Sequence, residues 1–176
     1  MIRSFVLNLE LHLIFHLIMK SSKKKILVII GTRPNFIKIT QFRKVASQYS
    51  DQLEVKILHT GQHYDHKMST VFFDQFGLRP DIFLDIRPDR PAKQIAETIG
   101  KLSDLFSENR PNMVIVVGDV NSTLAAAVAA NKNEIPTAHL ESGLRSFDKS
   151  MPEEHNRIVA DHLCQLHFVT EESGLI

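Results

Sequence analysis

Short apolar runs alternate with longer amphipathic stretches along most of the chain. The runs predict six strands, at 26–30, 53–59, 82–86, 113–119, 135–141 and 165–170. Apolar residues at helical spacing predict helices over 35–48, 66–76, 91–108, 123–130 and 152–163. Because strand and helix alternate, the pattern predicts right-handed βαβ crossovers. We therefore expect an α/β fold whose doubly wound parallel sheet carries helices on both faces.

The first residues do not fit this pattern. The apolar stretch 5–19 is interrupted by Glu10 and by other polar residues, and it is shorter than the about 20 apolar residues of a membrane-spanning helix. It also lacks the small-residue cleavage site of a secretory signal. We expect residues 1–23 to be an extension before the domain, with Met19 as the true start, or else a peripheral amphipathic anchor. The domain is then 24–176.

Composition excludes several classes of function. The chain has 176 residues and a net charge of +1, which excludes nucleic-acid binding by bulk charge. One cysteine excludes a disulfide framework, and the nine histidines are not at metal-ligand spacing, so no metal is expected. No G-x-G-x-x-G follows the first strand, which argues against a nicotinamide or flavin cofactor. We expect no cofactor.

Ionisable residues follow the predicted strands, where ligands bind in open α/β sheets. Arg33 and Lys38 come after the first strand, where two cations near a helix start indicate an anionic ligand such as a phosphate, or else are solvated charges. Asp119 follows the fourth strand, where it could cap a helix, and Glu141 ends the fifth. Glu153 and Glu154 open the next helix, where acids are stabilised in any case. The residues alone predict a domain that binds a phosphorylated ligand beside two or three carboxylates.

Five motifs carry a more specific resemblance. They are GTRPNFIK (31–38), HTGQHYD (59–65), GDVNST (118–123), HLESGLRS (139–146) and MPEEHNR (151–157). In this order they resemble the non-hydrolysing UDP-N-acetylglucosamine 2-epimerases, from about Lys25 to the last residue. The first motif usually reads GTRPE in that family, and this chain has Asn35 in place of the acid.

The resemblance implies an isomerase that interconverts UDP-N-acetylglucosamine and UDP-N-acetylmannosamine for bacterial polysaccharide biosynthesis. Family members have two Rossmann-like domains, as in one class of glycosyltransferases, and this chain resembles the N-terminal one. The reaction is an elimination of UDP followed by its re-addition, which needs acid–base groups around the sugar and cations for the diphosphate. The implied catalytic or ring-binding residues are Asp119, Glu141 and Glu153, with Glu154 as the alternative to Glu153. The implied substrate-binding cations are Arg33, Lys38, Arg145 and Arg157.

The family also implies a regulatory site and partners. A second UDP-N-acetylglucosamine activates many bacterial members, and Gln62, His63 and Arg90 match positions used there. Residues 170–173 are typical of a helix start, so we expect a longer protein whose C-terminal domain follows in frame or is encoded separately. The complete enzyme is expected to be a cytoplasmic homodimer with no nucleic-acid or membrane partner. The alternatives are an inactive nucleotide-sugar-binding module and a hydrolysing relative.

Overall fold

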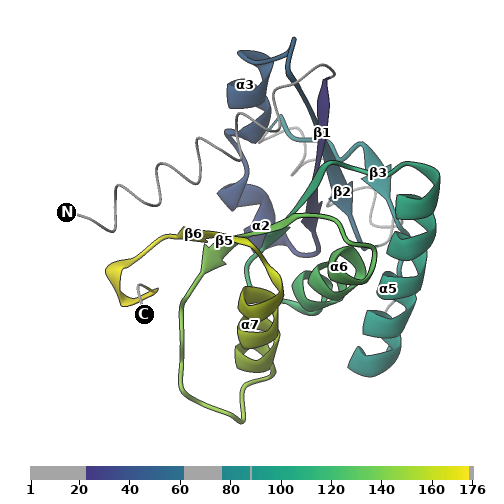
Figure 1. Cartoon of the computed structure of the whole chain (residues 1–176). Coiled ribbons are helices and arrows are strands. Elements are labelled where there is room, and N and C mark those ends of the chain that lie inside the picture. The colour runs from purple at the N-terminus through teal and green to yellow at the C-terminus, as the bar shows by residue number, and fades with distance from the viewer. Residues whose placement is uncertain (1–22, 62–76, 88, 175–176) are drawn as a thin grey trace.

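The sheet is parallel throughout and has the strand order β3-β2-β1-β4-β5-β6 (Figure 1). A computed structural model describes residues 23–61, 77–87 and 89–174, and six strands lie within them. These are β1 (Lys24–Ile30), β2 (Leu53–His59), β3 (Ile82–Phe83), β4 (Met113–Val117), β5 (Thr137–Ser142) and β6 (Leu166–Val169). The order reverses between β1 and β4, which is the switch point where doubly wound folds bind their ligands. The predicted doubly wound α/β fold is confirmed.

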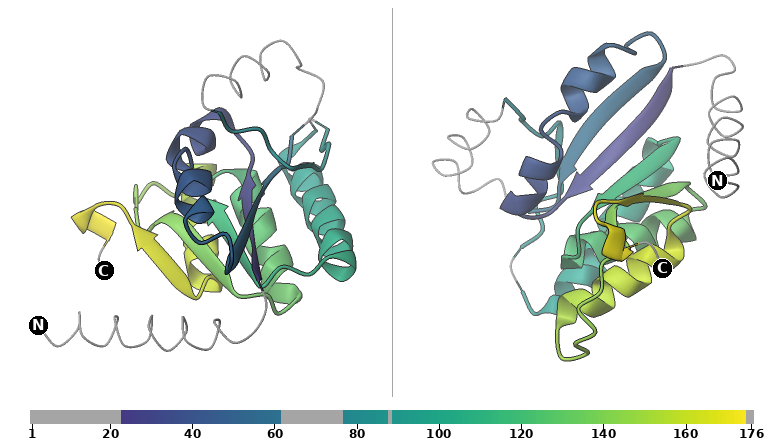
Figure 2. Two further views of the ribbon diagram at one scale, coloured as in Figure 1. Left: turned by 90° about the horizontal axis from the view of Figure 1, so that it is seen from above. Right: turned by 90° about the vertical axis from the view of Figure 1, so that its left-hand side faces the viewer.

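The helices lie on both faces of the sheet, as the right-hand view of Figure 2 shows. They are α2 (Arg33–Lys38), α3 (Phe42–Ser47), α5 (Pro91–Glu108), α6 (Asn121–Lys132) and α7 (Pro152–Leu163), followed by a short 3₁₀ turn, η1 (Glu172–Gly174). Successive residues of β1 point to opposite faces. Leu27 and Ile29 pack with the residues of α5, α6 and α7, whereas Val28 and Ile30 pack with Phe36 on the α2 face.

Two predicted elements differ from the structure by more than two residues at an end, whereas the other described ones differ by two residues or fewer. The helix expected over 35–48 is two short helices, because the chain turns at Ile39 and Thr40. Ile39 is fully buried there, and the Thr40 hydroxyl donates to the Ile37 carbonyl, which favours a tight turn. The strand expected over 82–86 ends at Phe83, since Asp85 adopts a positive φ of 52°. The helix predicted over 66–76 lies outside the described residues.

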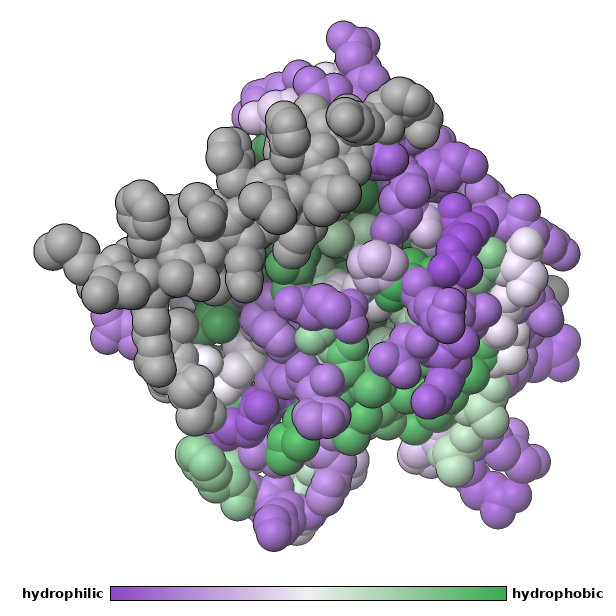
Figure 3. All heavy atoms as spheres, in the orientation of Figure 1, coloured by the Kyte–Doolittle hydropathy of each residue, from purple (hydrophilic) through white to green (hydrophobic). Residues whose placement is uncertain are grey.

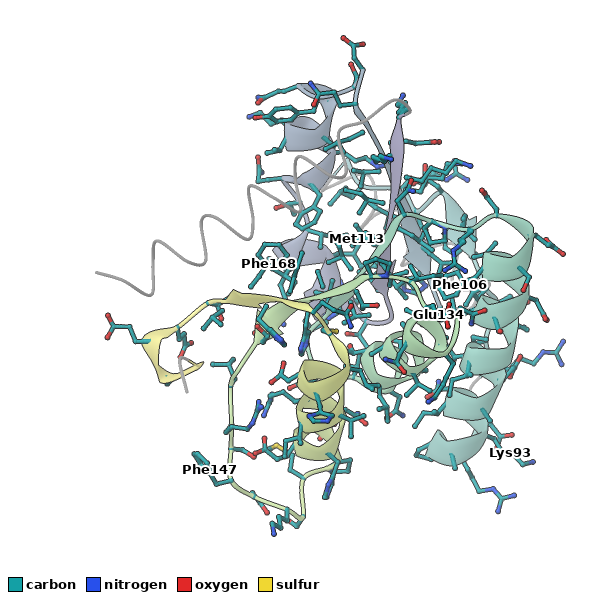
Figure 4. All side chains as sticks on the ribbon, viewed as in Figure 1. Lys93, Phe106, Met113, Glu134, Phe147 and Phe168 are labelled. Carbon is teal, nitrogen blue, oxygen red and sulfur yellow. The ribbon has the colours of Figure 1, made fainter. Side chains whose placement is uncertain are left out.

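Apolar side chains remain exposed on α7 and on the loop before it. They include Phe147, Met151, Ile158 and Val159, of which Phe147 is 84% exposed. Figure 4 shows Phe147 directed away from α7, and Figure 3 shows apolar side chains reaching the surface in the lower half of the same view. No helix within the described residues is long and apolar enough to cross a membrane.

Candidate active site

The turn after β1 is held by Asn35. Its side-chain oxygen accepts hydrogen bonds from the backbone N–H groups of Gly31 and Thr32, at 3.2 and 3.1 Å. Its side-chain nitrogen donates to the Val117 carbonyl at the end of β4, at 3.2 Å. Asn35 is 2% exposed, so the amide joins the ends of β1 and β4 from inside the fold. An ionised glutamate would accept the first two bonds but could not donate the third.

Three polar side chains converge on Gly118, the residue after β4. A Cβ atom at Gly118 would lie 3.2 Å from Asn35 Nδ2, 3.3 Å from Lys38 Nζ and 3.4 Å from Glu141 Oε2. Gly118 also has a φ of 69°, which side chains seldom adopt. Glycine is therefore favoured here by its conformation, and a Cβ atom would make tight contacts with these three side chains. It lets an amide and a cation from α2 and a carboxylate from β5 gather at the switch point.

Glu141 lies in a β-bulge. Leu140 pairs with Phe168 and Ser142 with Val169, so Glu141 is the extra residue of β5, with a φ of 72°. Bulges beside functional sites re-aim a side chain. Here the carboxylate forms an ion pair with Lys38, which lies 103 residues earlier in the chain.

Asp119 is held by α7. Its carboxylate forms an ion pair with Arg157, and its backbone carbonyl accepts a 2.9 Å hydrogen bond from Asn156 Nδ2. Arg157 also donates to Glu154 at 2.6 Å, so this one guanidinium bridges two acids. The structure thus brings together Asp119 with Arg157, and Glu141 with Lys38.

Glu153 and Glu154 have different surroundings although they are neighbours. Glu154 is buried and accepts from the backbone N–H groups of Ser146 and Phe147, both at 3.0 Å. The Ser146 bond outweighs the opposing effect of burial, and with the Phe147 bond and the Arg157 charge it lowers the pKa of Glu154. Glu153 is exposed and lines a pocket instead. Glu154 is occupied as the anchor of the loop, whereas Glu153 has access to a ligand.

That pocket lies at the carboxyl ends of β1, β2 and β4 and has a volume of about 240 Å³. Its lining comprises Gly31, Thr32, Thr60, Gly61, Ile86, Gln94, Thr98, Val120, Asn121, Ser122 and Glu153. Sites for drug-sized ligands usually have about 300–1,000 Å³. The pocket is therefore large enough for only part of such a ligand.

The other predicted residues lie at different places. Arg33 is exposed at the start of α2, and Arg90 is exposed just before α5. Arg145 donates to Asp161 of α7 at 2.6 Å and to the Leu144 carbonyl. Gln62 and His63 lie outside the described residues. Within the part of the chain that the structure describes, no group of side chains could hold a metal ion.

Comparison with known proteins identifies the family of this chain. Residues 46–174 match a family model described as UDP-N-acetylglucosamine 2-epimerase. The chain belongs to this family. The match covers four of the five motifs that carried the resemblance, and the fifth, GTRPNFIK, precedes it.

Several family relatives are similar over most of this chain. UDP-2,3-diacetamido-2,3-dideoxy-D-glucuronate 2-epimerase of Pseudomonas aeruginosa is 44% identical over 145 residues, which are 82% of this chain and 41% of the relative. The Methanocaldococcus jannaschii UDP-GlcNAc 2-epimerase, solved in complex with UDP-GlcNAc and UDP, is 35% identical, with a TM-score of 0.78 over 86% of this chain and 41% of its own. The Neisseria meningitidis enzyme bound to UDP-GlcNAc is 31% identical, with a TM-score of 0.77 over 85% of this chain and 41% of its own. The chain thus spans about 41% of the length of these family members.

Sequence reasoning assigned no role to three residues that hold the candidate site together: Asn156, Asp161 and His139. A signal for Asp161 was present, because Glu154, Arg157 and Asp161 have the i, i+3, i+7 spacing of one helix face. Asn35 was noted only as a departure from the usual motif. Its bond to Val117 spans 82 residues, a separation that no local pattern reveals.

Proposed function

We propose that this chain forms one wall of the active site of a UDP-N-acetylglucosamine 2-epimerase, which interconverts UDP-N-acetylglucosamine and UDP-N-acetylmannosamine. The observation that carries the proposal is the gathering of the Asp119, Glu141 and Glu153 carboxylates and the Lys38 and Arg157 cations at the β1–β4 switch point. Relatives with the same fold were solved with UDP-GlcNAc bound.

The chemistry of the sugar explains why both charges are needed. The hydrogen at carbon 2 is not beside a carbonyl and is therefore not acidic. In the proposed reaction UDP leaves from carbon 1, positive charge builds there, and carbon 2 loses its proton to a carboxylate, leaving a glycal. UDP then adds back while a proton is delivered to the opposite face of carbon 2. Carboxylates serve the proton transfers, and cations stabilise the departing diphosphate.

The surroundings of each carboxylate support separate roles. Glu153 is the acid–base candidate that has access to the pocket, and Glu154 is the structural neighbour that anchors the loop. Asp119 and Glu141 are each paired with a cation. A substrate diphosphate that competes for Lys38 or Arg157 would release the paired carboxylate for proton transfer. Arg33 and Arg145 are the further diphosphate candidates.

A complete site needs a second wall, because the pocket fits only part of a nucleotide sugar. We propose that the second wall corresponds to the part of the relatives that this chain does not cover. Activation by a second nucleotide sugar near Gln62, His63 and Arg90, a homodimeric assembly, a cytoplasmic location and a role in polysaccharide biosynthesis belong to the same proposal.

A second candidate substrate has its own support. The Pseudomonas aeruginosa relative is 44% identical and is named for UDP-2,3-diacetamido-2,3-dideoxy-D-glucuronate, whose sugar carries a carboxylate. The chemistry at carbons 1 and 2 would be the same, so the switch-point residues would keep their roles. Relative turnover of the two nucleotide sugars distinguishes the candidates.

The test is a fusion of residues 24–176 to the remaining part of the Methanocaldococcus jannaschii enzyme. Deuterium incorporation at carbon 2 in deuterated water, followed by NMR, reports proton exchange with either nucleotide sugar. We expect exchange, and Glu141→Gln in the fusion should slow it by about 10²–10⁴-fold, as is typical of one acid–base group.

Two other outcomes would identify the alternatives. A folded fusion that binds UDP but exchanges no deuterium would indicate an inactive binding module. Release of UDP with free N-acetylmannosamine would indicate a hydrolysing relative. Either result would contradict the proposal.

A further inference from the structure

His139 is fully buried in β5, and both of its ring nitrogens have a partner. Nδ1 lies 2.5 Å from Asp161 Oδ1 in α7. Nε2 lies 2.7 Å from the carbonyl oxygen of Gly118, the residue after β4. The ring therefore connects β5, the turn after β4 and α7, and it bonds the glycine on which the polar side chains converge.

The proton count of the ring follows from these partners. A carbonyl oxygen only accepts, so Nε2 must carry a proton. The other carboxylate oxygen of Asp161 accepts from the Gly143 N–H at 3.1 Å and from Arg145 Nη1 at 2.6 Å. Burial opposes ionisation of Asp161, but the bonds from His139, Arg145 and Gly143 outweigh it and lower its pKa to about 2. An ionised carboxylate also only accepts, so Nδ1 carries a proton as well.

We propose that His139 is a buried imidazolium that, paired with Asp161, sets the positions of Asp119 and Glu141. The catalytic meaning of this positioning rests on the proposed function, whereas the charge of the ring does not. His139 does not reach the pocket lining, and it acts through the backbone that carries the two carboxylates.

The bonds of this pair reach both carboxylates by short paths. Gly118, whose carbonyl receives the Nε2 proton, directly precedes Asp119. Glu141 lies between His139 and Gly143 in the sequence, and both of these residues are hydrogen-bonded to Asp161. The backbone of the bulge is therefore held in place on both sides of Glu141.

The same helix face also holds the carboxylate of Asp119. Asp161 lies four residues after Arg157 in α7, and Arg157 forms an ion pair with Asp119. One helix therefore fixes the turn after β4 twice: it holds the Asp119 side chain through Arg157, and it holds the Gly118 backbone through Asp161 and His139.

The local charges favour this assignment. The charged or titratable groups that face the pair within the described residues are Arg145 from the loop after β5 and the buried Cys164 after α7. Burial, and then the Asp161 charge, raise the pKa of this thiol and keep it neutral. Two cations share one anion, which leaves positive charge beneath the ligand edge of the sheet. This charge would stabilise the ionised carboxylates above it and would attract a phosphorylated ligand.

The charge of His139 can be measured directly on the whole chain. NMR of protein labelled with ¹⁵N in its histidine rings reports the proton occupancy of each nitrogen. We expect both His139 nitrogens to carry a proton at about pH 7, because each faces an acceptor. The exposed His167 serves as the internal reference. A His139 ring with one unprotonated nitrogen at neutral pH would overturn the proposal.

The positioning role needs a matched pair of variants. Thr137→Val removes a buried hydrogen bond from the other end of the same strand, at 2.9 Å to the Ile135 carbonyl. His139→Gln should shift the backbone amide signals of Gly118, Asp119 and Glu141, whereas Thr137→Val should leave them in place. Equal shifts of these amide signals in both variants would show that His139 has no special positioning role and would overturn the proposal. If His139→Gln does not fold, Asp161→Asn provides the test. In that variant the His139 ring should lose one proton. Since no measurement uses a substrate, failure here is distinct from failure of the proposed function.

Discussion

At the scale of single residues, Glu141 combines a strained backbone with a functional side chain. Its φ of 72° lies in the left-handed region, which costs a residue with a Cβ atom about 1–2 kcal/mol relative to glycine. The bulge and the bonds of Gly143 and His139 hold it there. Such strain persists at functional sites because the surrounding structure enforces it.

This strain predicts a difference between two variants of Glu141. Glu141→Gly and Glu141→Ala both remove the ion pair with Lys38, but only glycine relieves the backbone. The glycine variant should unfold with a free energy about 1 kcal/mol higher than the alanine variant, measured in urea. Equal stabilities would show that the left-handed conformation carries no strain.

Cys164 is predicted to be unreactive in the folded chain. Burial and the nearby Asp161 charge raise the pKa of its thiol to about 12, so almost no thiolate is present at about pH 8. Alkylation by iodoacetamide should be slow in buffer and should become fast in urea. It is the only cysteine in the sequence, so the total label reports on it alone. Rapid labelling of the folded chain would contradict the burial.

At the scale of elements, α7 joins the sheet to the site through one face. Glu154 anchors the loop, Arg157 holds Asp119, and Asp161 holds His139, Gly143 and Arg145. The exposed apolar side chains Ile158 and Val159 lie on the same helix but outside this network. The position of α7 should therefore depend strongly on the ionisation of its acids.

Asp161 gives this dependence a direction. Its folded pKa of about 2 lies below the unfolded value of about 3.9, so the stabilisation is present above about pH 4 and is lost as pH falls toward 2. Asp161→Asn should be less stable at neutral pH and should show a flatter loss of stability over that acid range. Asp104→Asn, at an exposed position of α5, is the control and should retain the full acid dependence. An unchanged acid profile in Asp161→Asn would contradict the network.

The elements could largely be predicted from the sequence because each is a local pattern. The buried strands β1 and β4 and the amphipathic α5 have clear apolar periodicity, and all three were predicted within a few residues. The break between α2 and α3 could not be predicted, since Ile39 continues the helical pattern but turns into the core.

At the scale of the whole molecule, the side chains with which the site residues pair could not be predicted from the sequence. Sequence placed Lys38, Asp119 and Glu141 at one edge of the sheet, and the structure confirms that edge. The pairing of Lys38 with Glu141 depends on the β-bulge and on the glycine at position 118, and neither has a distinctive local pattern.

The isolated chain is predicted not to epimerise. The pocket is open and smaller than a nucleotide sugar needs, so one wall can neither exclude water nor orient the leaving group. Deuterium incorporation at carbon 2 of UDP-N-acetylglucosamine by residues 1–176 should equal that of a protein-free control. Incorporation well above that control would show that the second wall is unnecessary.

The central claim is that a nucleotide sugar binds at the β1–β4 switch point, and an NMR titration of the ¹⁵N-labelled chain with UDP-N-acetylglucosamine tests it most directly. The account predicts that the amide signals that shift are those of Gly31, Thr32 and 118–122, even if binding is weak. The opposite end of the sheet offers the internal comparison, because a second, smaller pocket there is lined by Lys25, Lys56 and Leu105. Amide shifts confined to that end would contradict the account. So would the absence of any amide shift in the labelled chain at a ligand concentration that saturates the fusion protein.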